Sequence, residues 1–230
     1  MPSQQTIRRY YKPAVFMLCL IPALPALHSM VALIANHFNN SISQAIVNSV
    51  GYWSFAQSAD PIASLLHGQG EWALRFLVIT LAVTPVRFML SAPWLISFRR
   101  MFGLYAFTYV LLHFLVYLFL DQTLYWPGIV EDIAKRPFIT IGFAALLLLI
   151  PLAVTSTNKM MRRLGKRWHK LHKFIYVIVP LGVWHFWWLV KKDITEPLIY
   201  AAITALLLGY RYWRSYLRKP ANKPAAKAAQ

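Results

Sequence analysis

Six long apolar runs divide this 230-residue sequence, and they constrain its fold more than any other feature. They cover residues 13–36, 72–90, 101–121, 138–157, 172–190 and 196–213. About 20 apolar residues cross the roughly 30 Å hydrocarbon layer of a bilayer as an α-helix. Because lipid offers no hydrogen-bond partner to the backbone, a helix is the form that each run is expected to take. The pattern predicts an all-α membrane protein, a bundle of six transmembrane helices.

The placement of charge predicts the orientation of these helices. With six spans both termini lie on one side, and that side holds 19 of the 24 Lys and Arg residues. The opposite side holds the other five and all seven Asp and Glu residues. The positive-inside rule then places both termini in the cytoplasm. The basic residues behind the net charge of +17 are concentrated on this one side. We therefore interpret the charge as a signal of membrane orientation and expect no nucleic-acid partner.

The chain is predicted to contain one membrane domain with short flanks. We expect a cytoplasmic flank at 1–12, the transmembrane domain at 13–213 and a basic, disordered cytoplasmic tail at 214–230, with residues 37–71 forming a polar outer loop. The single cysteine, Cys19, excludes a disulfide within the chain. No G-x-G-x-x-G motif is present, so a nicotinamide nucleotide has no predicted site and reducing equivalents are expected from another protein.

Two deep histidines are the first candidate ligands. His113 lies about 13 residues into the third run and His185 about 18 residues past Arg167, so both are predicted toward the outer half of the bilayer. The third and fifth runs cross in the same direction. Two imidazoles at related depth on two helices are a ligand set for bis-histidine haem. The alternative is two unrelated buried histidines that hydrogen-bond to hydroxyl or backbone groups.

His172 is predicted to serve a different site. It precedes His185 by 13 residues, a rise of about 20 Å, so the two side chains do not reach one iron. It is expected near the cytoplasmic entrance, where it would contact a second cofactor. The position 13 residues before His113 is Arg100 rather than a histidine. The sequence therefore supports one haem and leaves a second open, and His169 is expected to be a solvated interfacial residue.

Five basic residues are candidate anion contacts, each with a simpler interpretation. Arg75 follows Glu71 by four residues, which favours an ion pair, although a cation there would also suit a haem propionate. The segment NKMMRRLGKRWHKLHK suits lipid headgroups or a flavin phosphate. The full set of candidate propionate or phosphate contacts is Arg75, Arg99, Arg100, Arg163 and Lys166.

Four stretches carry a resemblance to a known family. HGQGEWALRFLVITLAVTPVR, RRMFGLYAFTYVLLHFLVYLFL, LAVTSTNKMMRRLGKRWHKLHKFIYVIVPLGVWHF and EPLIYAAITALLLGYRY resemble the MsrQ (formerly YedZ) family of haem-binding membrane subunits, a branch of the ferric-reductase-like transmembrane group. The resemblance covers about residues 60–213. It implies that His113, His172 and His185 occupy the haem-associated positions of the family, and that His169 does not. The outer loop at 37–71 is longer than the family pattern.

The resemblance also implies a function in electron transport. A cytoplasmic NAD(P)H-flavin reductase would supply electrons, FMN and haem b would carry them across the bacterial inner membrane, and a periplasmic MsrP-like molybdoenzyme would reduce methionine sulfoxide in oxidised periplasmic proteins. The chain would then be an electron-transfer subunit and not the catalytic subunit. Two alternatives stay open: a stand-alone ferric-chelate reductase or NADPH-oxidase-like cytochrome b, and a small permease or scaffold with incidental histidines.

Overall fold

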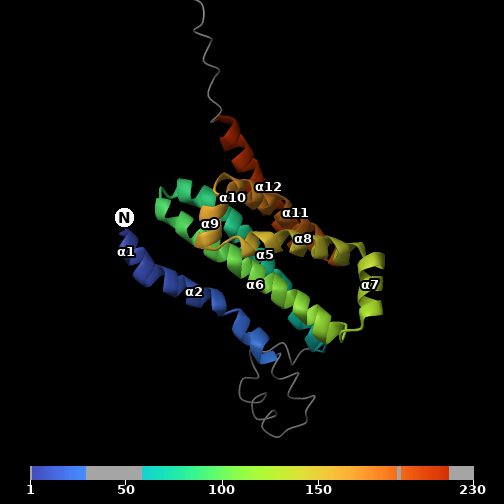
Figure 1. Ribbon diagram of the computed structural model, residues 1–230. Coiled ribbons are helices and arrows are strands. Elements are labelled where there is room, and N and C mark those ends of the chain that lie inside the picture. The colour runs from blue at the N-terminus through green and yellow to red at the C-terminus, as the bar shows by residue number, and fades with distance from the viewer. Residues whose placement is uncertain (1, 30–58, 191–192, 218–230) are drawn as a thin grey trace, which may run out of the picture.

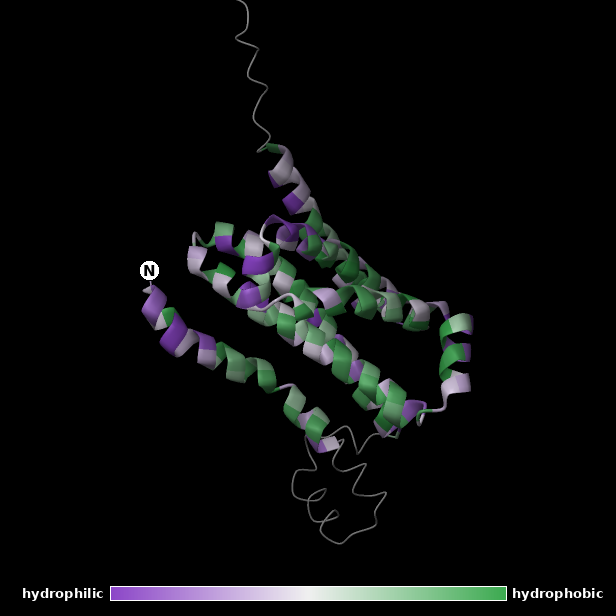
Figure 2. Ribbon diagram, viewed as in Figure 1, coloured by the Kyte–Doolittle hydropathy of each residue, from purple (hydrophilic) through white to green (hydrophobic). Residues whose placement is uncertain are grey.

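The described chain is all-helical. The computed structural model describes residues 2–29, 59–190 and 193–217, and its regular structure in these ranges consists of helices alone (Figure 1). Four helical segments are long and apolar enough to cross a membrane: Gln4–Ser29, Pro61–Met89, Pro93–Asp121 and Pro137–Val154. Figure 2 shows hydrophobic residues along most of their length. The prediction of an all-α membrane protein is confirmed.

The N-terminal segment packs along the bundle through tyrosine hydroxyls. It comprises α1 (Gln4–Thr6), η1 (Ile7–Tyr11) and α2 (Lys12–Leu20). The phenol groups of Tyr105 and Tyr109 donate to the carbonyl oxygens of Phe16 and Cys19, at 2.8 and 3.0 Å. Helix α2 ends at Leu20, just before Pro22, a residue that has no N–H to continue the ladder. Of the predicted first run, residues 30–36 lie outside the described part of the chain.

Helix α5 (Pro61–Met89) begins eleven residues before the apolar run that predicted it. Asp60 caps it, because its carboxylate accepts a hydrogen bond from the Ala63 N–H at 3.0 Å, and Pro61 occupies the first helical position. Residues 61–71 are therefore helix and not outer loop, which corrects the expected boundary. Residues 37–58 of that loop fall outside the described part of the chain. The correction matters because the added turns carry residues of the site.

The described part of the bundle is completed by helices α6 (Arg99–Val116), α7 (Trp126–Lys135), α8 (Pro137–Val154), α11 (Ile175–Leu189) and α12 (Thr195–Leu217). After η4 (Pro93–Phe98), α6 continues into η5 (Tyr117–Asp121), and α7 connects it to α8. Helix α5 packs against α6, and α11 packs against both α8 and α12. The core includes Phe76, Leu81, Tyr109, Leu149 and Val179.

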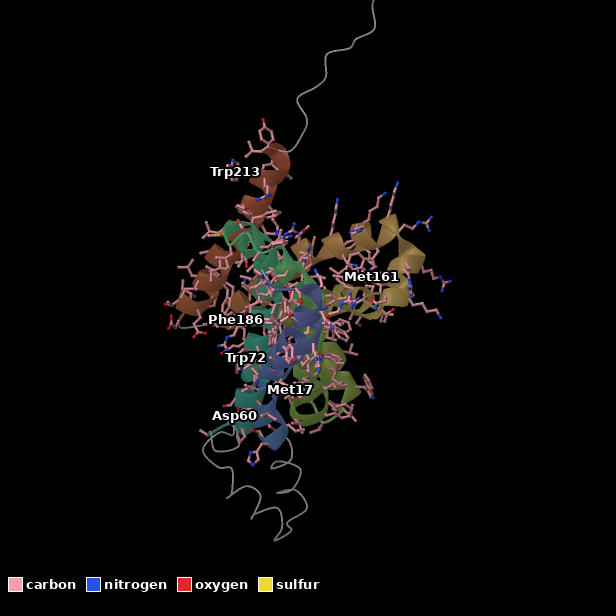
Figure 3. All side chains as sticks on the ribbon, turned by 90° about the vertical axis from the view of Figure 1, so that its left-hand side faces the viewer. Met17, Asp60, Trp72, Met161, Phe186 and Trp213 are labelled. Atoms are coloured by element: carbon pink, nitrogen blue, oxygen red, sulfur yellow. The ribbon has the colours of Figure 1, made fainter. Side chains whose placement is uncertain are left out.

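A short basic hairpin lies between α8 and α11. It consists of α9 (Asn158–Leu164) and α10 (Lys166–Leu171), followed by η6 (His172–Phe174). Gly165 joins the two helices with a φ of +49°, a left-handed conformation that favours glycine. Figure 3 marks the hairpin by Met161, with nitrogen-tipped side chains around it. The hairpin thus presents its basic residues away from the helical core.

An arginine compensates for the backbone defect that a proline makes in α5. Pro85 lies inside this helix and has no N–H, so the carbonyl of Leu81 has no partner four residues on. Arg211 of α12 donates to this carbonyl through Nη2 at 2.7 Å, and to the Tyr176 hydroxyl through Nη1 at 2.6 Å. One guanidinium therefore ties α12 to both α5 and α11.

Candidate functional site

Helices α5, α6, α8 and α11 line a cavity of about 280 Å³, just below the usual range for small-molecule sites. Its polar lining residues lie near the start of α5, the end of α6 and the start of α8. Because these neighbouring helices alternate in direction, all three positions are at the same end of the bundle. Those residues are His67, Glu71, Tyr117, Asp121 and Arg136. The other end is apolar, with Leu77, Leu146, Leu149 and Ile178. The cavity therefore suits a ligand with one polar edge.

His113 and His185 face each other within this cavity. Their ring centroids are 6.1 Å apart and the ring planes lie at 83°. His113 Nδ1 is 2.9 Å from the carbonyl oxygen of Leu66 on α5, and His185 Nδ1 is 2.6 Å from that of Phe138 on α8. A carbonyl oxygen only accepts, so Nδ1 carries the proton in each neutral ring and Nε2 keeps a lone pair. Both rings are thus oriented by backbone groups, and each keeps the lone pair of its Nε2.

Two glycines provide the space for these rings. A Cβ atom at Gly142 would lie 2.8 Å from His185 Nδ1 and 2.9 Å from its Cε1. At Gly70 it would lie 3.2 Å from the corresponding atoms of His113. The backbones of α8 and α5 therefore approach the imidazoles more closely than a side chain would allow. This approach is what brings each carbonyl within hydrogen-bond distance.

The geometry of the pair fits a metal that carries its own equatorial ligands. A metal–imidazole bond is about 2 Å and a ring nitrogen lies about 1 Å from its centroid, so two imidazoles on one metal have centroids about 6 Å apart. Within 2–29, 59–190 and 193–217, no group of three or more His, Cys, Asp or Glu is placed to hold a metal ion. Two imidazoles alone do not complete the shell of a bare ion. An iron porphyrin needs only these two, and its carboxylate edge suits the polar end of the cavity.

His172 lies outside the residues that line this cavity. It stacks on Trp168 with centroids 3.8 Å apart, and its Nδ1 is 3.1 Å from the Trp168 carbonyl oxygen. Trp168 is itself fixed, because its Nε1 donates to the Thr155 carbonyl at 3.0 Å. The Ser156 hydroxyl is 3.5 Å from His172 Nε2. The three histidines thus form one facing pair and one separate residue, while His169 is exposed.

The five candidate basic residues do not line the cavity. Arg75 pairs with Glu71 at 2.8 Å, contacts the Tyr200 hydroxyl at 3.3 Å and lies over the Trp72 ring. Arg100 contacts Asn158 and the sulfur of Met161, and so connects α6 to α9. The other three differ in their exposure to solvent. Arg99 is half-buried at the start of α6, whereas Arg163 and Lys166 are exposed on the hairpin.

Three residues of the site were missed from the sequence. Gly70 was assigned to a loop, and Gly142 was not distinguished from its apolar run, although an isolated glycine within a helical pattern signals close packing. Arg136 is one of the five basic residues that the charge count places on the outer side, and nothing in the sequence distinguishes it from the other four. Its position directly before Pro137 marks the start of a helix, but the direction of its side chain is visible only in the structure.

Comparison with known proteins agrees with this geometry. Residues 68–183 match the ferric reductase like transmembrane component, so the chain belongs to this family of membrane proteins. Within it, the chain is 56% identical over 161 residues to "Protein-methionine-sulfoxide reductase heme-binding subunit MsrQ" of Xanthomonas campestris pv. campestris (strain 8004), covering 70% of this chain and 74% of the relative. The protein of the same name from Ralstonia nicotianae is 52% identical over 158 residues, covering 67% and 73%. The chain is thus a member of the MsrQ family of haem-binding subunits. No solved structure matches it significantly.

Proposed function

We propose that this chain is a membrane cytochrome b in which His113 and His185 would hold one haem b. The facing pair carries the proposal: two rings 6.1 Å apart, each with Nδ1 on a backbone carbonyl. Ligating histidines in proteins commonly donate their second ring N–H to such a group. Relatives whose printed name includes "heme-binding subunit" support the same cofactor.

The residues of the pair would hold and tune the cofactor. The hydrogen bonds to Leu66 and Phe138 fix the ring orientation and make Nε2 a stronger donor to the metal. The apolar walls keep water from one end of the cavity. A haem in this site would supply one-electron redox chemistry. Because His113 and His185 would both bind its iron, such a site would favour outer-sphere electron transfer over oxygen binding.

The proposed topology has six spans with both termini in the cytoplasm of the bacterial inner membrane. Four described helices meet the length and hydropathy expected of a span. Helix α11 has 15 residues, or about 22 Å, and extends its reach through the preceding η6 and α10. Helix α12 has 23 residues, with Arg211 bonded inside the bundle and Arg214 bonded to Tyr210. The polar mouth of the cavity would then face the periplasm.

A second cofactor is proposed near His172, on the cytoplasmic side. The Trp168–His172 stack and the nearby hairpin support this placement, since an aromatic surface beside cations suits either a flavin or a second haem. Arg99, Arg100, Arg163 and Lys166 are the proposed contacts for its phosphate or propionate groups. FMN is the proposed flavin, and a cytoplasmic NAD(P)H-flavin reductase is the proposed electron donor.

The proposed electron acceptor is a periplasmic MsrP-like molybdoenzyme that reduces methionine sulfoxide in oxidised periplasmic proteins. The printed name of the relatives, a protein-methionine-sulfoxide reductase subunit, supports this assignment. A stand-alone ferric-chelate reductase would instead lose electrons to ferric chelate or oxygen. Mixing the reduced protein with each acceptor separates these functions, because only purified MsrP should reoxidise it rapidly.

Absorbance spectra of the detergent-purified protein test the haem site. We expect a Soret band and low-spin bands after reduction with dithionite. His113→Ala and His185→Ala should each abolish the haem of the facing pair, whereas His172→Ala should retain it. A full low-spin spectrum in purified His185→Ala would refute the ligand assignment. A colourless wild-type protein, expressed with ample haem, would favour a permease or scaffold.

A further inference from the structure

Arg136 occupies a distinctive position at the mouth of the cavity. It separates α7 from α8 and caps the first turn of α8, where its backbone oxygen accepts from the Ile139 N–H at 2.9 Å. Among the cavity-lining residues of the described chain, Arg136 is the single Lys or Arg. It also lies two residues before Phe138, whose carbonyl holds His185. A cation is therefore built into the same turn that orients a proposed ligand.

An anchored carboxylate holds one side of this guanidinium. Arg136 Nε pairs with Asp132 Oδ1 at 3.1 Å. The other oxygen of Asp132 accepts from Gln122 Nε2 at 3.1 Å and lies 3.4 Å from the hydroxyl of Tyr117, which also lines the cavity. Asp132 has only 14% of its side chain exposed, against 56% for Arg136. The acid is thus a fixed support and the arginine extends from it.

This support leaves the two terminal nitrogens of Arg136 available. Neither Nη1 nor Nη2 has a hydrogen-bond partner within the described residues. A guanidinium held through Nε still presents a fork that matches a carboxylate with two parallel hydrogen bonds. The nearby acids do not take this role: Glu71 is paired with Arg75, and exposed Asp121 accepts from the Gln122 amide.

We propose that Arg136 binds a carboxylate group on the edge of the cofactor through Nη1 and Nη2, with Asp132 as the residue that positions it. The proposal rests on the haem site proposed above. Haem has two carboxylates on one edge, and the polar end of the cavity, where Arg136 lies, is where that edge belongs. Arg136 then takes the propionate contact that the sequence suggested for Arg75, whose guanidinium is committed to Glu71, Tyr200 and Trp72.

Haem release and haem potential test the assignment in the purified full-length protein. Haem dissociation is followed by transfer to excess apomyoglobin, and the potential by a redox titration of the Soret band. Arg136→Gln should keep the low-spin spectrum but release haem about tenfold faster, because charge-assisted hydrogen bonds to the carboxylate are lost. Its reduced fraction at a fixed potential should fall, since a cation that favours the more negative reduced state is gone.

The neighbouring cation provides the matched control. Lys135 pairs with Glu131, is 73% exposed and does not line the cavity, so Lys135→Gln should release haem at the wild-type rate. Arg136→Lys keeps the charge but not the fork, and should lie between Arg136→Gln and wild type. The Arg136→Lys variant also replaces Arg136→Gln as the test if Arg136→Gln does not yield folded protein. If Arg136→Lys released haem at the wild-type rate, the proposed pair of hydrogen bonds from Nη1 and Nη2 would be refuted.

Two outcomes separate this inference from the function on which it rests. Wild-type protein without haem overturns the haem site and the arginine contact together. Wild-type protein with haem, together with an Arg136→Gln variant within twofold of its release rate and potential, overturns the arginine contact alone. Faster release from Arg75→Gln but not from Arg136→Gln would assign the carboxylate to Arg75 instead.

Discussion

Replacing Gly142 by alanine tests whether the close approach of α8 to His185 governs the site. The added Cβ would lie 2.8 Å from Nδ1 and 2.9 Å from Cε1 of this imidazole, whereas ordinary contact begins at 3.4 Å. The ring or the helix must therefore move by 3.4 − 2.8, about 0.6 Å. Because the Nδ1–O distance to Phe138 is only 2.6 Å, any such movement lengthens or bends the bond that orients the ring.

The expected cost is that of overpacking a filled interior, about 1–3 kcal/mol, or roughly five- to 150-fold in haem affinity. Alanine is the better helix former by about 1 kcal/mol, so a loss in this variant arises from the contact and not from the helix. The assay is the haem-to-protein ratio of purified protein, with electron paramagnetic resonance of the oxidised state as the probe of ligand orientation.

Other glycines of the chain provide a graded control. Gly70→Ala places Cβ at 3.2 Å from His113, so its effect should be smaller, and Gly209→Ala, with no heavy atom within 4 Å, should match wild type. Haem content should therefore fall in the order Gly209→Ala, Gly70→Ala, Gly142→Ala. A Gly142→Ala protein with full haem and an unchanged low-spin signal would refute the reasoning, because the ring would then have space that the structure denies it.

Three further predictions concern the other residues that position the site. Arg211→Met should lower the free energy of unfolding by about 1–3 kcal/mol in a thermal or denaturant melt, because it leaves the buried Leu81 carbonyl unpaired. In a Pro85→Ala background this cost should shrink, since the alanine supplies the backbone N–H that proline lacks, and equal costs in the two backgrounds would contradict the account. Asp60→Ala should cost about 1 kcal/mol through loss of the N-cap of α5, whereas Asp60→Asn should cost less because its side-chain oxygen still accepts the bond. His172→Ala should change the spectrum of the second cofactor while the facing-pair haem keeps its ratio to protein, and equal loss of both would count against separate sites.

The sequence predicted the helices better than it predicted their ends. Hydropathy located the four described helices that are long and apolar enough to cross a membrane, because lipid demands long apolar helices, and the structure confirms the all-helical architecture of the described residues. It placed the start of α5 too late, because His67, Gly70 and Glu71 look like loop residues when read singly. They belong to the helix because Asp60 and Pro61 start it upstream, and because a polar cavity receives them.

The partners of the individual side chains were less accessible to prediction. Two histidines on separate runs suggested a pair, and the structure brings His113 and His185 together. The partners of their Nδ1 atoms are backbone carbonyl oxygens. Every residue type has this group, so the sequence gives no sign of which residue provides it. Arg75 and Arg136 both looked like outer cations. Whether the side chain of Arg75 or that of Arg136 reaches the cavity depends on the rotation of α5 about its axis and on the direction in which α7 leads the chain into α8. Amino-acid composition gives neither quantity.

The main-chain support of the two imidazoles determines what kinds of genetic change this centre tolerates. Any amino acid at 66 or 138 that keeps the helix also keeps its carbonyl, so substitution there leaves the supports intact. An inserted or deleted residue between Leu66 and the core residue Phe76 is different, because it would turn the acceptor by about 100° around the axis of α5 relative to the packed part of this helix. Substitution at 66 or 138 therefore preserves the two backbone hydrogen bonds even though both side chains line the cavity, whereas a change of length does not preserve them. Drift by substitution and strict conservation of length are expected side by side in the same turns.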